Sequence, residues 1–109
     1  MTTPSQQPLI SVIVASYHGG TMLENCISSL AEQDYPNVEI IVVDNGSRKD
    51  IAGTLSKRFP QCKWVTLREN GGFAGGYNSG IDASQGTFVA LINDDAVADK
   101  SWLSSMSGC

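Results

Sequence analysis

The stretch LISVIVAS, residues 9–16, is a nearly continuous run of apolar and β-branched residues. Such a run is typical of a strand covered on both faces, as in a parallel sheet, because a strand with one wet face alternates with polar residues. Runs of similar character follow at residues 38–44 (VEIIVVD) and 87–92 (TFVALI), with the shorter KWVTL at residues 63–67. The sequence therefore predicts four strands.

Segments with helical spacing separate these strands. Residues 21–33 carry apolar side chains three and four positions apart, and Thr21 with Glu24 matches a capping box, which predicts a helix start there. The alternation of strands and helices predicts an α/β fold with a parallel sheet of about four strands, flanking helices and right-handed crossovers. Further helices are expected around Ile51, Leu55 and Phe59, through Ile81 and Ala83, and from Trp102 onward.

Length and charge limit the function classes. The chain has 109 residues, a net charge of -4 and no run of basic residues, which argues against nucleic-acid polymers and anionic membranes as main partners. We expect residues 1–8 to be a flexible lead-in and residues 9–109 to form one domain. The polar start resembles no secretory signal and the apolar runs are too short to cross a bilayer, which favours a cytoplasmic location, with peripheral attachment to the inner membrane face as the alternative.

The cysteines indicate a reduced protein. Cys26, Cys62 and Cys109 are odd in number and show no metal-binding spacing. This pattern favours free thiols in a cytosolic protein over a disulfide.

Polar residues follow every predicted strand. Parallel strands end at one edge of their sheet, and ligands bind there where the strand order reverses. We therefore expect these residues to form one site. They are Ser16, Tyr17 and His18; Asp44, Asn45 and Ser47; Arg68, Glu69 and Asn70; and Asn93, Asp94 and Asp95.

The adjacent acids Asp94 and Asp95 suggest a cation site. Two carboxylates suit Mg²⁺ or Mn²⁺, which take oxygen ligands and keep waters that a phosphate replaces. A solvated turn with a helix cap explains the same pair. On the residues alone, both interpretations remain open.

Three other polar or aromatic residues carry two interpretations each. The Asp44 carboxylate can accept a hydrogen bond from a nucleotide base or a sugar hydroxyl, or it can form an Asx turn. The ring of Tyr17 can stack on the flat ring of a ligand, or it can cover the edge of the sheet. The guanidinium of Arg68 can bind a phosphate, or Arg68 is an ordinary surface arginine. His18 is the single histidine, and we assign it no role.

The stretch RENGGFAGGYNSGI, residues 68–81, concentrates glycine just where a helix is expected. Glycine in a helix interior costs about 1 kcal/mol relative to alanine, so the backbone here must meet another requirement. The glycines match neither a G-x-G-x-x-G fingerprint nor a Walker loop. Three uses remain: a turn with positive φ, close approach of a ligand, and tight packing of the helix on the sheet through Gly76 and Gly80.

Four segments together resemble the family 2 glycosyltransferases, which have the GT-A fold. ISVIVASYHGG (residues 10–20) looks like their first strand and loop, and IIVVDNGSRKD (residues 40–50) is similar to their second strand and its turn. Residues 68–81 resemble the N-x-G-F-A-x-G-x-N-x-G segment of the subgroup with rhamnosyl- and galactofuranosyl-type transferases. VALINDDAVADKSWL (residues 89–103) resembles the strand, the D-x-D-type metal motif and the W-L that follows.

The resemblance implies a role for each matched residue. Asp95 would be the main metal ligand, with Asp94 contacting ribose or metal, and Asn93 takes the first position of the triplet as in N-x-D variants. Asn78 would anchor a helix–loop junction. The nucleotide-binding residues would be Ala15, Tyr17, Asp44, Arg68, Asn70, Gly72 and Asp94.

The implied reaction transfers a sugar, with inversion, from a UDP- or dTDP-linked donor to a hydroxyl of a saccharide or lipid-linked acceptor, as in cell-wall or polysaccharide biosynthesis. Mg²⁺ or Mn²⁺ would stabilise the departing diphosphate, and a carboxylate would act as general base. In the family that base and the acceptor surface lie downstream of the metal motif. We therefore expect residues 9–109 to be the nucleotide-sugar-binding portion of a GT-A domain, truncated before the acceptor-binding part and inactive alone, with an open sheet edge that favours self-association.

Other functions remain open. A non-catalytic nucleotide-binding or regulatory module would use the same half-fold. A sugar-nucleotide pyrophosphorylase shares this type of fold, but SYHGG lacks the arginine and lysine of that class's loop. A phosphohydrolase with Asp94 as nucleophile would carry its acids after the first strand and not after the fourth.

Overall fold

The predicted strands form one parallel sheet in the computed structural model, which describes residues 7–106. They are β1 (Ile10–Ser16), β2 (Val38–Asn45), β3 (Lys63–Leu67) and β4 (Phe88–Asn93), in the order β3-β2-β1-β4. The predicted α/β fold with four parallel strands and flanking helices is confirmed. The predictions for residues 1–6 and for Cys109 lie outside the described residues.

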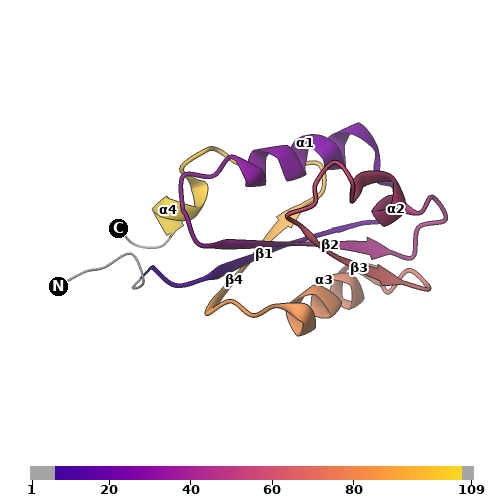
Figure 1. Cartoon of the computed structure of the whole chain (residues 1–109). Helices are drawn as coiled ribbons and strands as arrows, with labels where there is room; N and C mark the ends of the chain where they lie inside the picture. The colour runs from indigo at the N-terminus through magenta and orange to yellow at the C-terminus, as the bar shows by residue number, and fades with distance from the viewer. Residues whose placement is uncertain (1–6, 107–109) are drawn as a thin grey trace.

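The helices cover the two faces of the sheet unequally (Figure 1). Helices α1 (Gly20–Ala31), α2 (Ile51–Leu55) and α4 (Trp102–Met106) lie on one face, and α3 (Gly72–Ala83) lies on the other. The chain steps outward from β1 to β3 and then returns to the far side of β1 to form β4. Because crossovers are right-handed, this reversal of direction places α3 on the opposite face from α1 and α2.

Alternating side chains of the strands build a core on each face. Val12 and Val14 of β1 join the larger cluster beneath α1, whereas Ile13 packs with Val43 and Tyr77 beneath α3. All four of these β1 and β2 residues are fully buried. Burial on both faces explains why the strands read as continuous apolar runs.

The expected capping box at the start of α1 is wrong. The helix begins at Gly20 with Gly19 as its N-cap, and no side chain caps it. The turn before the helix therefore places Thr21 inside the first helical turn, where it does not accept the capping bond. Glu24 instead pairs with Arg58.

Strand β4 is an uncovered edge of the sheet. It pairs with β1 alone, and Phe88, Val89 and Leu91 are 58%, 41% and 45% exposed. Helix α3 packs on β1, β2 and β3, so the α3-facing side of β4 stays open. No helix within residues 7–106 is long and apolar enough to cross a membrane.

We predict that Gly80→Ala destabilises the protein, because a Cβ at Gly80 would lie 2.4 Å from Cγ2 of the buried Ile13. Overpacking costs about 1–3 kcal/mol, against a gain of about 1 kcal/mol in helix propensity. We expect urea denaturation to show a loss of up to about 2 kcal/mol in the free energy of unfolding.

Gly75→Ala is the matched control, because a Cβ at Gly75 of the same helix meets nothing within 4 Å. We expect this variant to gain up to about 1 kcal/mol from helix propensity alone. Equal effects of the two substitutions would show that close packing of α3 on the sheet is not the reason for Gly80.

Candidate functional site

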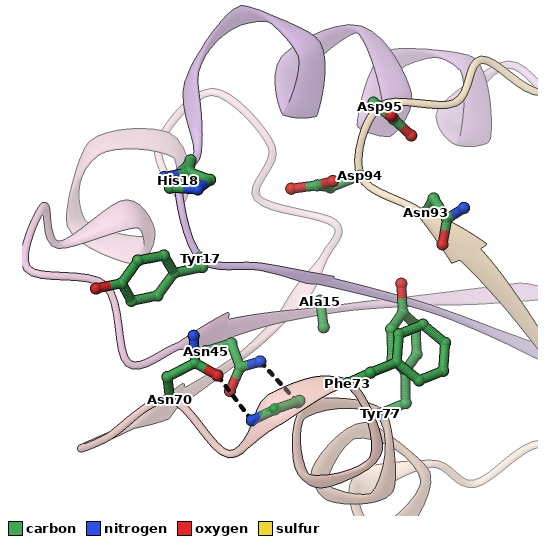
Figure 2. Close-up of a pocket in the computed structure, with 11 residues that line it drawn as sticks. Ala15, Tyr17, His18, Asn45, Asn70, Phe73, Tyr77, Asn93, Asp94 and Asp95 are labelled. Carbon is green, nitrogen blue, oxygen red and sulfur yellow. Dashed lines mark hydrogen bonds between the residues drawn. The ribbon is translucent and has the colours of Figure 1, made fainter.

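A cleft of about 430 Å³ opens at the carboxyl ends of the strands (Figure 2). It lies where the strand order reverses, between the ends of β1 and β4, which is where open α/β sheets bind ligands. Figure 2 shows Asp94 and Asp95 on one side of it and Asn45, Asn70 and the start of α3 on the other. Its lining residues are Ala15, Tyr17, His18, Asn45, Asn70, Gly72, Phe73, Tyr77, Asn93, Asp94 and Asp95.

The alternation of side chains along each strand decides which strand-end residues line the cleft. Ala15 and Asn93 are register partners on β1 and β4, and both lie on the face that α3 covers. Asn45 lies on the same face of β2. Ser16 and Asp44, one position away from Ala15 and Asn45, are directed to the opposite face.

Asn45 joins the end of β2 to the glycine-rich segment. Its Oδ1 accepts a hydrogen bond from Gly71 N at 2.9 Å, and its Nδ2 donates to Gly72 O at 3.0 Å. A Cβ at Gly76 would lie 2.8 Å from this Nδ2, so the glycine leaves room for the amide against α3. Glycine in this stretch therefore serves packing of the helix, and Gly72 adds a turn with φ of 73°.

Aromatic side chains lie at both ends of the cleft. The rings of Phe73 and Tyr77 pack against each other at a tilt of 39° with centroids 4.7 Å apart, and the Tyr77 hydroxyl donates to Ile92 O at 2.5 Å. Burial, together with the nearby acids, raises the pKa of Tyr77, so its hydroxyl remains a neutral donor. Tyr17 and His18 meet edge to face at 5.0 Å on the first loop.

The two acids at the end of β4 differ in their surroundings. Asp94 is half-buried, and its Oδ2 accepts a hydrogen bond from Ser16 Oγ at 2.8 Å, whereas Asp95 is exposed. Beneath them the Cys26 thiol donates to Asn93 O at 3.5 Å. Burial, reinforced by the charges of Asp94 and Asp95, raises the pKa of Cys26 to about 11, which keeps the thiol protonated.

These acids fit a divalent cation that is held jointly with a ligand. Within residues 7–106, no three histidine, cysteine, aspartate or glutamate side chains gather into a metal site. Mg²⁺ and Mn²⁺ sites in phosphate-handling proteins often use only one or two carboxylates and take other oxygens from the phosphate and water. Asp94 and Asp95 supply such a pair, and Asn93 adds an amide oxygen beside them.

Most of the predicted site residues meet in this cleft, and two do not. Asp44 is 1% exposed, and its carboxylate accepts hydrogen bonds from Ser47 N and Ile51 N, so it holds the turn before α2. Arg68 is exposed beside a separate hollow formed with Leu67 and Glu69. The residues brought together as predicted are Ala15, Tyr17, Asn70, Gly72, Asp94 and Asp95.

The expected anchoring of a helix–loop junction by Asn78 is wrong, because α3 already begins at Gly72 and Asn78 lies exposed in its middle. Sequence reasoning missed two lining residues, Phe73 and Tyr77, whereas His18, Asn45 and Asn93 belonged to the strand-end residues expected in the site. The spacing of the two aromatics four positions apart was a usable signal, since it places both on one side of a helix.

The comparisons with known proteins agree on one family. Residues 11–107 match the family described as glycosyl transferase family 2. Glycosyltransferase AglE of Haloferax volcanii is 31% identical over 104 residues, which cover 91% of this chain and 34% of AglE.

Solved structures give the same result for the fold. Residues 1–349 of TarS of S. aureus in complex with UDP-GlcNAc align with a TM-score of 0.82 at 28% identity, over 92% of this chain and 30% of that TarS chain. The mannosyltransferase PcManGT of Pyrobaculum calidifontis, in complex with GDP-Man and Mn²⁺, aligns with a TM-score of 0.75 at 25% identity, over 89% and 30% of the two chains. The chain thus spans about a third of the length of the AglE, TarS 1–349 and PcManGT chains that it matches.

We predict that Asn45→Ala loosens the glycine-rich segment, because Gly71 N and Gly72 O both lose their partner. Loss of a part-buried hydrogen-bonding partner costs about 1–3 kcal/mol in the free energy of unfolding. Hydrogen exchange should show a faster-exchanging Gly71 amide.

Asn37→Ala is the control, because Asn37 is exposed and its amide makes one bond, to Gln7 O. We expect it to leave the stability and the Gly71 exchange rate unchanged. A Gly71 amide that stays equally protected in Asn45→Ala would contradict the proposed clamp.

Proposed function

The chain belongs to glycosyl transferase family 2, and from this membership we propose that its cleft binds the nucleotide diphosphate of a sugar donor together with Mg²⁺ or Mn²⁺. The observation that carries this proposal is the placement of two carboxylates opposite a glycine-bearing loop across one cleft. Its volume of about 430 Å³ lies within the usual range of small-ligand sites. The ligands named for TarS and PcManGT, UDP-GlcNAc and GDP-Man, support the same ligand class here.

The charge of the cleft supports dependence on a metal. Among its lining residues none is lysine or arginine, and Asp94 and Asp95 contribute two carboxylates. A diphosphate that approaches these acids without a cation is repelled, since like charges disfavour each other at such range. A divalent cation between the acids and the diphosphate reverses that interaction, and when bound it stabilises the charge of the departing diphosphate.

The remaining lining residues suit the nucleoside. Tyr17 is 41% exposed at one end of the cleft, where its ring is available to a base. Ala15 forms a small floor between the two sides, and Asn70 and Gly72 lie on the side opposite the acids, where Asn70 Oδ1 accepts a hydrogen bond from Gly72 N at 2.7 Å. Asp44 serves the nucleoside indirectly, through the turn that its carboxylate holds. Arg68 would contact the ligand only if the loop after β3 moved toward it.

We propose that the 109-residue polypeptide binds the donor without transferring the sugar. Inverting transfer needs a carboxylate that takes the proton of the acceptor hydroxyl. Among the lining residues the only carboxylates are those of Asp94 and Asp95, which this proposal assigns to the cation, so the cleft offers no separate base. Transfer to a saccharide or lipid-linked acceptor then belongs to the longer proteins of this family.

Further expectations concern self-association, the nucleotide, the product and the location. The exposed Phe88, Val89 and Leu91 of the edge strand β4 favour self-association of the isolated polypeptide. UDP or dTDP as the nucleotide and a cell-wall or polysaccharide product follow from the family resemblance. A cytoplasmic location, with attachment to the inner membrane face as the alternative, remains the expectation from the sequence.

Isothermal titration with UDP, dTDP and GDP, each with and without Mn²⁺, tests the ligand class. We expect one nucleotide to bind in the presence of Mn²⁺ and to bind much more weakly without it, because of the acidic pair. The absence of binding to all three nucleotides in Mn²⁺ would rule out the proposed function.

We predict that Asp95→Asn weakens Mn²⁺-dependent nucleotide binding by about tenfold or more, because it removes one charge facing the cation. Asp82→Asn removes the same charge from the exposed carboxyl-terminal part of α3, away from the cleft, and should leave the affinity unchanged. Equal losses in the two variants would assign the effect to net charge and not to a metal ligand.

A further inference from the structure

We propose that Ser16 is a positioning residue that fixes the Asp94 carboxylate for its ligand. The proposal rests on the function proposed above, and it concerns a residue that does not itself line the cleft. Ser16 is the last residue of β1 and is only 1% exposed. Its hydroxyl acts on the cleft through Asp94.

The hydrogen bonds of Ser16 set the direction of its proton. Its Oγ accepts a bond from Gly19 N at 2.9 Å, which occupies an oxygen lone pair. The hydroxyl proton is therefore free to point to Asp94 Oδ2, 2.8 Å away. A hydroxyl that accepts one bond becomes a stronger donor in the next.

This arrangement leaves the two oxygens of Asp94 unequal. Oδ2 is held by Ser16, so Oδ1 is the oxygen available to a cation or a ribose hydroxyl in the cleft. Ser16 and Asp94 are 78 positions apart in sequence, and their bond joins the loop after β1 to the loop after β4. The bond thus links the two loops on either side of the strand-order reversal.

Asp95 provides the contrast. It is exposed, and no side chain of the described residues donates a hydrogen bond to it. One carboxylate of the pair is therefore oriented before the ligand arrives, and the other is oriented by the ligand. Pre-orientation of a ligating carboxylate by an outer hydrogen bond commonly contributes 10- to 100-fold to metal affinity.

We test this with Ser16→Ala, for which we expect the Mn²⁺-dependent nucleotide affinity to fall about tenfold. Ser11→Ala is the matched control, because Ser11 is also a buried serine of β1 whose hydroxyl bonds a carboxylate, that of Glu39, at the start of the strand. It should not change the affinity. Ser16→Thr keeps the hydroxyl and should retain most of the binding if the strand accepts the added methyl group.

A double-mutant cycle with Asp94→Ala separates positioning from general structural damage. If Ser16 acts through Asp94, Ser16→Ala causes no further loss in the Asp94→Ala background. An equal loss in both backgrounds, or an unchanged affinity of the single variant, overturns the proposal. If Ser16→Ala does not fold, Ser16→Cys replaces it, because a thiol is a weaker donor of similar shape.

A measurement without nucleotide keeps this proposal distinct from the proposed function. Three-bond NMR couplings across the Asp94 side chain should show one rotamer in the wild-type chain and averaged rotamers in Ser16→Ala. Averaged couplings in the wild type overturn the positioning role. A single wild-type rotamer with no nucleotide binding would leave Ser16 holding Asp94 while the proposed function fails.

Discussion

The reversal of strand order between β1 and β4 is the constraint on which the site depends. The chain builds β1, β2 and β3 outward in one direction and must then return past β1 to add β4. The returning helix α3 lies over β1, β2 and β3 and leaves β4 uncovered on that face. The loop after β3 consequently leads to α3 on one face, whereas the loops after β1 and β4 lead to α1 and α4 on the other, and the cleft lies between the two sides.

Close packing of α3 then brings the glycine-rich segment to that space. Gly76 and Gly80 face the sheet on one side of the helix, where Ala15, Asn45 and Ile13 occupy the room that a side chain would need. The helix therefore starts near the strand ends, with Gly72 and Phe73 at the cleft. The loss of helix propensity from glycine is offset by this contact with the sheet.

The sequence was enough to predict the four strands, the α/β fold and the edge of the sheet where polar residues meet, because these follow from apolar runs and from the geometry of parallel strands. It was not enough to choose between adjacent residues. Asp44 and Asn45 are both polar at the end of one strand, and only the register and facing of β2 decide that Asn45 enters the cleft.

The other errors have the same physical origin. The start of α1 depends on the turn at Gly19, and the position of Arg68 depends on the path of the loop after β3. Local patterns such as a capping box describe what a segment would do alone, and tertiary contacts override them. The resemblance to a family predicted the acidic pair and the loop, which line the cleft, and also Asp44 and Arg68, which lie outside its lining.

The buried polar residues at the strand ends form a frame, and the exposed ones form the surface that a ligand meets. Ser16, Asp44 and Asn45 are each less than 9% exposed, and each makes two hydrogen bonds. Ser16 joins the loops after β1 and β4, and Asn45 joins the end of β2 to the loop after β3. Buried polar groups that are fully hydrogen-bonded specify a single arrangement, since any other leaves a group unsatisfied. A cleft built from loops therefore acquires the fixed geometry that is usually expected of helices and strands.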